Sequence, residues 1–153
     1  MQTDRTVTEV IRRSILQNGW IELPSEGSSM FPFITQGSIC RFCLSDALPQ
    51  KGDILLYISE SGALIGHRLQ HTLSDGTYTR YVCKGDSNVT LDEPITKNQI
   101  IGKLTEVHTK SMLIKTNHPL AVLWGKLILH IPMFATCIHH YLGFKRSLRH
   151  KKI

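Results

Sequence analysis

Three short blocks of the sequence carry the residue types that can hydrolyse a peptide bond through a serine nucleophile. In chain order they contain Ser29, His67 and a pair of carboxylates, Asp86 and Asp92. A serine hydroxyl becomes an effective nucleophile when a neighbouring base removes its proton. Histidine, whose ordinary pKa is about 6.5, can do this near neutral pH. Because the blocks are far apart in the sequence, the fold would have to bring them together, as it does in serine hydrolases.

The order of these blocks resembles that of type I signal peptidases. The similarity is to the branch related to the endoplasmic reticulum and archaeal enzymes, in which histidine replaces the lysine base of bacterial relatives. LexA-type self-cleaving proteins are more distant relatives. The matching motifs are Ser-Met-x-Pro at 29–32, Gly-Asp with an apolar strand at 52–58, His-Arg at 67–68, Lys-Gly-Asp-x-Asn at 84–88 and Ile-Gly-Lys at 101–103. Ser-Met-x-Pro alone should occur by chance in roughly one chain in a hundred of this length, so the argument depends on the order of the motifs.

The resemblance implies a role for each residue. Ser29 matches the nucleophile and His67 the general base, while Asp92 matches the acid that orients the histidine. Asp86 is the alternative partner of His67, although a carboxylate in a Gly-Asp turn can instead cap local backbone amides. The backbone N–H of Ser29 is the expected oxyanion donor. Many bacterial relatives place a second serine two positions before the nucleophile, where this chain has Gly27.

Met30 and Pro32 complete the serine block and are the candidate substrate-binding residues. We expect Met30 to pack beneath the serine loop and Pro32 to restrict the loop by fixing one backbone torsion. Neither side chain is expected to take part in the chemistry.

Length and composition favour one catalytic domain with appendages. The chain has 153 residues, of which 41% are apolar, and a formal charge of +6. Five positive charges lie in the last nine residues, so the rest of the chain is nearly neutral, and we predict no nucleic-acid partner. Cys40 and Cys43 have the spacing of half a zinc site, but no second pair accompanies them. We therefore predict neither a metal nor a cofactor.

The hydrophobic pattern predicts a mainly β fold. An amphipathic helix is expected over residues 1–19, followed by a catalytic domain over 20–116. Its strands are expected at 20–23, 38–44, 54–58, 63–69, 77–83 and 100–107, with a further candidate at 110–115. Strands this short favour a bent antiparallel sheet or partly closed barrel, which signal peptidase-like and LexA-like domains share. An exposed strand would then pair with an extended substrate peptide.

The segment 117–144 is apolar and precedes a basic tail at 145–153. Its length would allow a membrane span, but Lys126 and Pro132 interrupt it. We favour an interfacial helix, or two helices broken at Pro132, lying on an anionic membrane through residues 119–153. A spanning helix and ordinary packing against the domain remain open. The expected location is the plasma membrane of a bacterium or archaeon, on a side that the sequence leaves open.

Three functions follow from these patterns. The first is a membrane-associated serine endopeptidase that cleaves signal or leader peptides through an acyl-enzyme. The second is a non-catalytic module that binds leader peptides on the same fold, which the glycine at position 27 favours. The third and weakest is a LexA-like self-cleaving regulator, for which the sequence shows neither a DNA-binding helix pair nor a lysine base.

Overall fold

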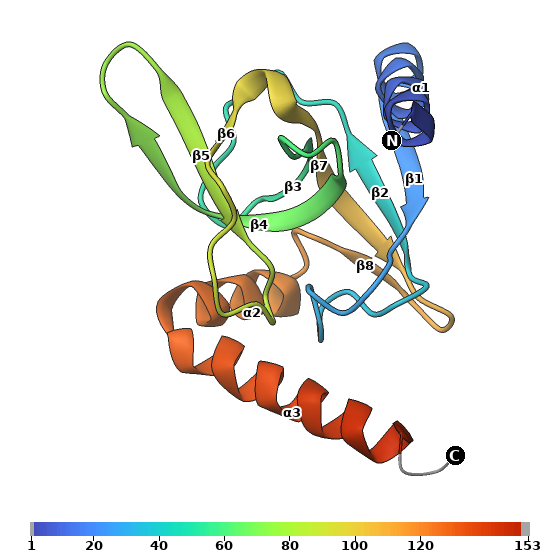
Figure 1. Cartoon of the computed structure of the whole chain (residues 1–153), viewed down its shortest axis with the longest axis vertical. Helices are drawn as coiled ribbons and strands as arrows, with labels where there is room; N and C mark the ends of the chain where they lie inside the picture. The colour runs from blue at the N-terminus through green and yellow to red at the C-terminus, as the bar shows by residue number, and fades with distance from the viewer. Residues whose placement is uncertain (1, 151–153) are drawn as a thin grey trace.

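Residues 2–150, which the computed structural model describes, fold mainly as an antiparallel β-sheet accompanied by three α-helices (Figure 1). The elements in chain order are α1 (Gln2–Asn18), β1 (Trp20–Pro24), β2 (Ile39–Cys43), β3 (Ile54–Ile58), β4 (Leu64–Ser74), β5 (Thr79–Lys84), β6 (Ile95–Thr96), the 3-10 turn η1 (Lys97–Gln99), β7 (Ile100–His108), β8 (Leu113–Lys115), α2 (Pro119–His130) and α3 (Pro132–His150). The mainly β, antiparallel class expected from the sequence is confirmed.

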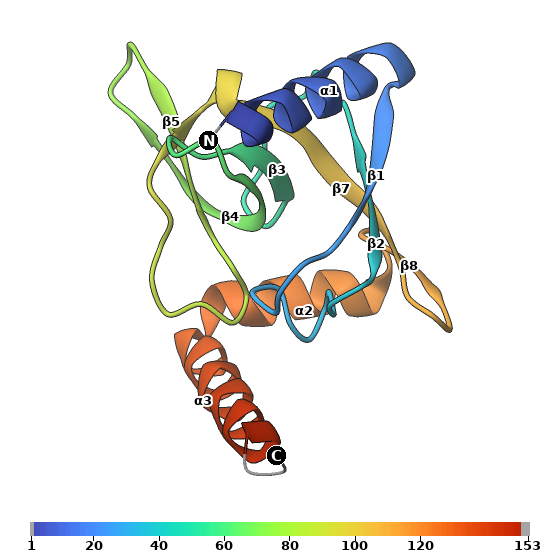
Figure 2. The same cartoon turned by 45° about the vertical axis from the view of Figure 1, so that its right-hand side comes forward.

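The sheet is open, with the strand order β1-β2-β7-β3-β4-β5-β6 and with β8 paired to β7. The long strand β7 joins the two parts of the sheet, since it pairs with β2 along one edge and with β3 and then β8 along the other. Register shifts interrupt the β2–β7, β3–β7 and β4–β5 ladders. Such irregularities bend strands and increase their twist, which accounts for the curvature of the sheet in Figures 1 and 2.

Most of the expected elements lie where the sequence pattern placed them. The strand at 54–58 has the predicted bounds, and the first helix ends at Asn18, just before Gly19 with its positive φ of 80°. The strand expected at 63–69 extends to Ser74, while the one expected at 110–115 forms only from Leu113. The two-residue strand β6 was not predicted, because two residues are too few to show a period.

Apolar side chains cover both faces of the sheet, and β3 contributes to each. On one face Leu56 packs in a cluster with Ile11 and Ile15 of α1. On the other face Leu55 and Tyr57 pack with residues from β4 and β5. A strand buried on both faces shows a continuous apolar run, which is why residues 54–58 were easy to recognise. The first cluster holds α1 against the sheet.

The apolar C-terminal segment forms two helices that break at the expected proline. The chain leaves α2 at Ile131, begins α3 at Pro132 and bends by 99° between them. Figures 1 and 2 both show α2 beneath the sheet and α3 leaving it at a steep angle. The tail expected from residue 145 is helical as far as His150, and its last three residues lie outside the described part of the chain. Among the described residues, no single helix is long and apolar enough to cross a membrane, although the bent pair together passes that test by length and composition.

Gly102 in β7 is closely enclosed, which generates a prediction about stability. A Cβ there would lie 2.8 Å from the Ile15 side chain and 3.0 Å from the carbonyl oxygen of Cys43. We expect Gly102→Ala to lower the free energy of unfolding by ~1–3 kcal/mol, because the β2 backbone would have to move. Denaturant unfolding monitored by circular dichroism measures the change.

The matched control is Gly143→Ala, the same substitution in α3. A Cβ at Gly143 meets nothing within 4 Å. Alanine is a better helix former than glycine, so we expect this variant to be more stable by about 0.5–1 kcal/mol. Equal effects of the two substitutions would show that the close contact at Gly102 does not determine stability.

Candidate active site

Ser29 and His67 line the same cleft, which has a volume of about 660 Å³. Residues of α1, β1 and β2 line the cleft together with the start of β4, from Leu64 to His67. The loop between β1 and β2 carries Ser29 into the cleft. The fold therefore brings Ser29 and His67 to one accessible cavity, which the hypothesis of a serine hydrolase requires.

The serine loop is held by its own turn and by two buried side chains. The backbone N–H of Ile34 donates to the carbonyl of Met30 at 2.9 Å. The side chains of Met30 and Ile34 are buried in the apolar cluster that also contains Ile11 and Ile15 of α1. At the base of the loop, Ser25 donates its backbone N–H to Ser38 and accepts from Gly37. These anchors give the loop a defined shape.

His67 is paired with Asp92. The Nδ1 atom of His67 lies 2.7 Å from Oδ2 of Asp92, and the histidine side chain is largely buried. A carboxylate can only accept, so the proton of this hydrogen bond belongs to Nδ1 and the remaining nitrogen, Nε2, is free to act as a base. The backbone N–H of Asp92 donates to the carbonyl of Cys83 at 2.9 Å, which fixes the carboxylate beside the end of β5.

Tyr57 is a second donor to the same carboxylate oxygen. Its hydroxyl donates to Oδ2 of Asp92 at 2.8 Å. Burial raises the pKa of Tyr57 well above its ordinary value, and the hydrogen bond to Asp92 raises it further. The phenol therefore stays protonated and continues to donate. Sequence reasoning did not find this residue, because an apolar strand such as 54–58 gives no signal that one aromatic side chain has a polar role.

The hydroxyl and the backbone N–H of Ser29 form no hydrogen bond with the described part of the chain, residues 2–150. The hydroxyl and His67 thus share the cleft without a direct bond. Catalytic hydrogen bonds are often long in an empty site and shorten when substrate binds. The role of the Ser29 backbone N–H as an oxyanion donor stays a prediction.

Asp86 is not the partner of His67. Its carboxylate is fully buried and accepts two bonds from the Arg68 guanidinium, Nε to Oδ1 and Nη2 to Oδ2, each at 2.8 Å. Trp124 of α2 donates its indole N–H to Oδ2 of Asp86 at 2.9 Å. Arg68 also donates to the carbonyl of Gly52 at 3.0 Å. Of the two acids left open by the sequence, Asp92 meets the histidine and Asp86 meets the neighbouring arginine.

The block at 84–88 also holds the serine loop. Ser87 donates its backbone N–H to the carbonyl of Ser29 at 2.8 Å, and its hydroxyl lies 2.8 Å from the carbonyl of Ser28. Gly85 permits this contact, because a Cβ there would lie 2.8 Å from the Ser29 carbonyl oxygen. The motif thus fixes the position of the serine loop as well as supplying Asp86. Sequence reasoning quoted Ser87 only as part of the motif.

The remaining candidate residues have different positions. Met30 is buried and lines the cleft, whereas Pro32 is exposed and is not one of the described residues that line it. Gly27 lines the cleft with a φ of 73°, and a Cβ there would meet nothing within 4 Å. A side chain is excluded at Gly27 by the backbone conformation rather than by lack of space.

The four cysteines are free thiols, and of these only Cys40 lines the cleft. Burial raises the pKa of Cys40 to about 11 and that of Cys83 to about 12, with the charge of Asp92 adding to the effect at Cys83. In β2, Cys40 points into the core, while Cys43 contacts Thr105 at 3.4 Å. Among residues 2–150, no group of three or more histidine, cysteine or acidic side chains could hold a metal ion.

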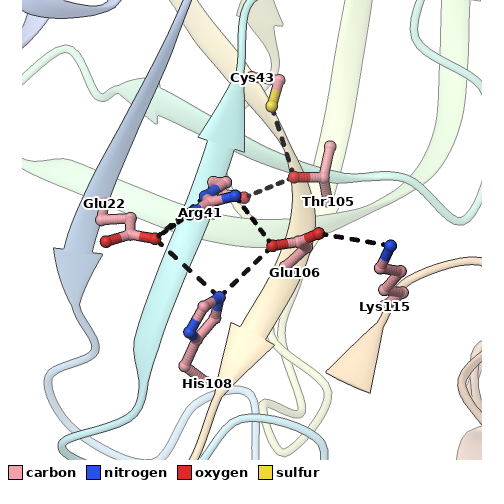
Figure 3. Close-up of polar contacts among 7 residues, drawn as sticks. All are labelled: Glu22, Arg41, Cys43, Thr105, Glu106, His108 and Lys115. Carbon is pink, nitrogen blue, oxygen red and sulfur yellow. Dashed lines mark hydrogen bonds and ion pairs between the residues drawn. The ribbon is translucent and has the colours of Figure 1, made fainter. Parts of the chain in front are cut away.

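A second polar cluster lies across β1, β2, β7 and β8 and is separate from the cleft (Figure 3). At its centre Arg41 pairs with Glu22 at 2.8 Å and with Glu106 at 3.1 Å. The hydrogen bonds that Arg41 donates to Glu22 raise the pKa of the guanidinium above its ordinary value. The buried neighbours of Arg41 in β2, Cys40 and Phe42, line the cleft, so Arg41 points to the opposite face of the strand. Such partly exposed ion pairs contribute little to the free energy of unfolding. Here Arg41 and its partners lie on the face of β2 that points away from the cleft.

Comparison with known proteins adds no assignment. No protein-family model matches the chain, and no curated protein matches it significantly. The geometry of the chain's own residues is therefore the basis for a functional proposal.

The buried Arg68–Asp86 pair generates a prediction. We expect Asp86→Ala to lower the free energy of unfolding by ~3–5 kcal/mol, because it leaves the Arg68 guanidinium buried without its carboxylate. Urea denaturation of the two proteins measures the loss. The matched control is Glu9→Ala, which removes the exposed pair with Arg13 on α1 and should cost less than about 1 kcal/mol. Similar losses in both variants would contradict the account of Asp86.

Proposed function

We propose that the protein is a membrane-associated serine endopeptidase of the signal peptidase type that cleaves signal or leader peptides. The observation that carries the proposal is the pairing of His67 with Asp92 at 2.7 Å in the cleft that Ser29 also lines. The proposal includes the finer fold, a partly closed barrel of signal peptidase or LexA type. The bent, open sheet is compatible with that fold.

The reaction would proceed through an acyl-enzyme. The Ser29 oxygen attacks the peptide carbonyl carbon while its proton passes to Nε2 of His67. The backbone N–H of Ser29 donates to the oxyanion that forms. When the C–N bond breaks, His67 returns the proton to the leaving amine. A water molecule then gives its proton to His67 and attacks the ester, and the proton returns to the Ser29 oxygen as the new carboxyl terminus leaves. Asp92 and Tyr57 keep the imidazole oriented throughout.

The substrate would bind as an added strand. Residues 64–67 of β4 pair with β3 along one edge, and within the described chain no strand pairs with their other edge, since β5 joins β4 only from Arg68 onwards. This free edge lines the cleft opposite Leu23 and Pro24 of the edge strand β1. An extended peptide laid between them would form main-chain hydrogen bonds and pass Ser29. By resemblance, small residues are preferred on the acyl side of the cleaved bond.

The bent helix pair α2–α3 would attach the protein to an anionic membrane surface. Leu120, Met133 and Phe144 are each about two-thirds exposed or more, at 69%, 73% and 65%. The chain contains basic residues but no acidic residue after Glu106. Exposed apolar side chains together with unopposed positive charge fit the interface of an anionic bilayer. The proposed location is the plasma membrane of a bacterium or archaeon.

A non-catalytic module that binds leader peptides is the second candidate. The observation that favours it is the absence, within residues 2–150, of a hydrogen bond between the Ser29 hydroxyl and His67. The same free strand edge would grip an extended peptide without cleaving it. Turnover distinguishes the two candidates.

The peptidase proposal is tested with a leader-containing peptide and purified full-length protein. We expect Ser29→Ala and His67→Ala to lower kcat/KM by on the order of 10⁴-fold, because each removes one partner of the proton transfer. Asp92→Asn should cost about 10²–10⁴-fold through loss of the imidazole orientation. Mass spectrometry of the products measures cleavage and its position.

The matched controls are Ser111→Ala and His71→Ala, which change an exposed serine and an exposed histidine outside the cleft. Both should cleave at the wild-type rate. Cleavage by all variants at one rate, or a rate that stays constant from about pH 8 to about pH 5, would reject His67 as the base, since an imidazolium cannot accept a proton. Binding without cleavage in the wild type would favour the second candidate.

The membrane proposal is tested by flotation with vesicles. We expect the protein to bind vesicles containing phosphatidylglycerol more strongly than vesicles of phosphatidylcholine, and to lose affinity as salt screens the charges. The double variant Leu120→Gln and Met133→Gln should bind at least about tenfold more weakly, since each buried apolar side chain contributes about 1.5–3 kcal/mol. Leu48→Gln, at an equally exposed position outside the helix pair, is the control. Equal binding by the double variant and the wild type would refute this surface.

A further inference from the structure

The C-terminal helix α2 packs directly against the charged pair behind the candidate active site. Trp124 donates its indole N–H to the fully buried carboxylate of Asp86 at 2.9 Å. One residue further on, a Cβ at Gly125 would lie 3.0 Å from Nη1 of Arg68. The absence of a side chain at Gly125 thus lets the helix backbone approach the guanidinium. In Figures 1 and 2 the loop that follows β5 reaches down to α2.

The Arg68–Asp86 pair is adjacent in sequence to both halves of the proposed catalytic site. Arg68 follows His67 in β4, and Asp86 precedes Ser87, whose backbone N–H and hydroxyl hold the serine loop. A movement of Asp86 would therefore be transmitted to the histidine through β4 and to the Ser29 carbonyl through Ser87. Trp124 is the one described side chain outside β4 that donates to this carboxylate.

Helix α3 touches the serine loop as well. The rings of Tyr141 and Phe31 stack with their centroids 6.2 Å apart, and Arg146 donates to the Ser28 hydroxyl at 3.1 Å. Trp124 packs edge-on against Phe134 at 6.5 Å, which links the two helices. Helix α3 thus contacts the serine loop through Tyr141 and Arg146, and its Phe134 packs against Trp124 of α2.

We propose that Trp124 is a positioning residue, which holds Asp86 through its indole N–H and thereby fixes the Ser29 loop and the strand that carries His67. This inference rests on the proposed peptidase function only for its effect on turnover. Its structural part, the control of the Ser29 loop by a donor on α2, can be measured without a substrate. A buried carboxylate that loses a donor is left partly unsatisfied, and it can regain a partner only if the loop at 84–88 shifts.

The experiment compares wild-type protein with Trp124→Phe, Trp124→His and Ile128→Ala in the full chain. The phenylalanine variant keeps an aromatic ring but no N–H, whereas histidine offers a ring N–H again. Ile128→Ala removes a buried side chain of α2, which is 2% exposed, and leaves the bond to Asp86 in place. It is the control for a helix that is simply packed less well.

Hydrogen–deuterium exchange of the peptides covering 27–33 and 84–88 is the first readout. We expect Trp124→Phe to raise exchange in both peptides by about tenfold, and Trp124→His to restore part of the protection. Ile128→Ala should raise exchange in α2 but not at 27–33. If Trp124→Phe affects only α2, or if Ile128→Ala has the same effect on the serine loop, Trp124 has a packing role and the proposal is overturned.

Steady-state cleavage of the leader-containing peptide is the second readout. We expect Trp124→Phe to lower kcat by roughly tenfold with KM unchanged, because substrate still pairs with β4 while the nucleophile is less well held. An unchanged kcat with raised loop exchange would overturn the catalytic part. If the wild type cleaves nothing, the peptidase proposal fails, and the exchange data still decide whether Trp124 positions the loop.

Discussion

The ion pair between Arg68 and Asp86 is the interaction on which the rest of the structure depends. Both groups are almost completely excluded from water, and removing an ion from water costs several kcal/mol. The cost is offset by two parallel hydrogen bonds within the pair and by further bonds to the Gly52 carbonyl and Trp124. Such a pair tolerates little displacement, because any shift leaves a buried charge without a partner. It therefore holds β4, the loop after β5, the turn before β3 and α2 in one arrangement.

The arrangement at His67 follows from this constraint. Arg68 and His67 are consecutive residues of a strand, so their side chains point to opposite faces. With Arg68 fixed on one face, His67 is directed to the other, where Asp92 and Tyr57 lie. The two carboxylates thus have separate tasks, determined by the alternation of the strand. Asp86 stabilises the framework, while Asp92 orients the imidazole.

The sequence predicted the elements better than it predicted the contacts. The strand at 54–58 was defined by its continuous apolar run, and the first helix by its three- and four-residue spacing. The order of the motifs predicted that Ser29 and His67 lie close together, and both do line one cleft. It left Asp86 and Asp92 as alternative partners of His67. That choice depends on how the chain between Lys84 and Ile95 turns back over the sheet, which no local pattern reports. Tyr57 and Trp124 were missed for a related reason, since their polar contacts are made by residues that belong to apolar periodic patterns.

The C-terminal segment shows that apolar composition alone does not distinguish contact with a membrane from packing against the protein. Residues 117–144 met the sequence criteria for membrane contact, and α2 nevertheless buries Ala121, Gly125 and Ile128. The absence of a side chain at Gly125 allows the helix to approach Arg68 closely, while Leu120 and Leu123 stay exposed. One helix can thus make two kinds of contact, with Trp124, Gly125 and Ile128 on the side that faces the domain and Leu120 and Leu123 on the side that faces outward. If the outward face rests on lipid, the indole N–H on its inner side links that surface to Asp86, whose neighbour Ser87 holds the serine loop.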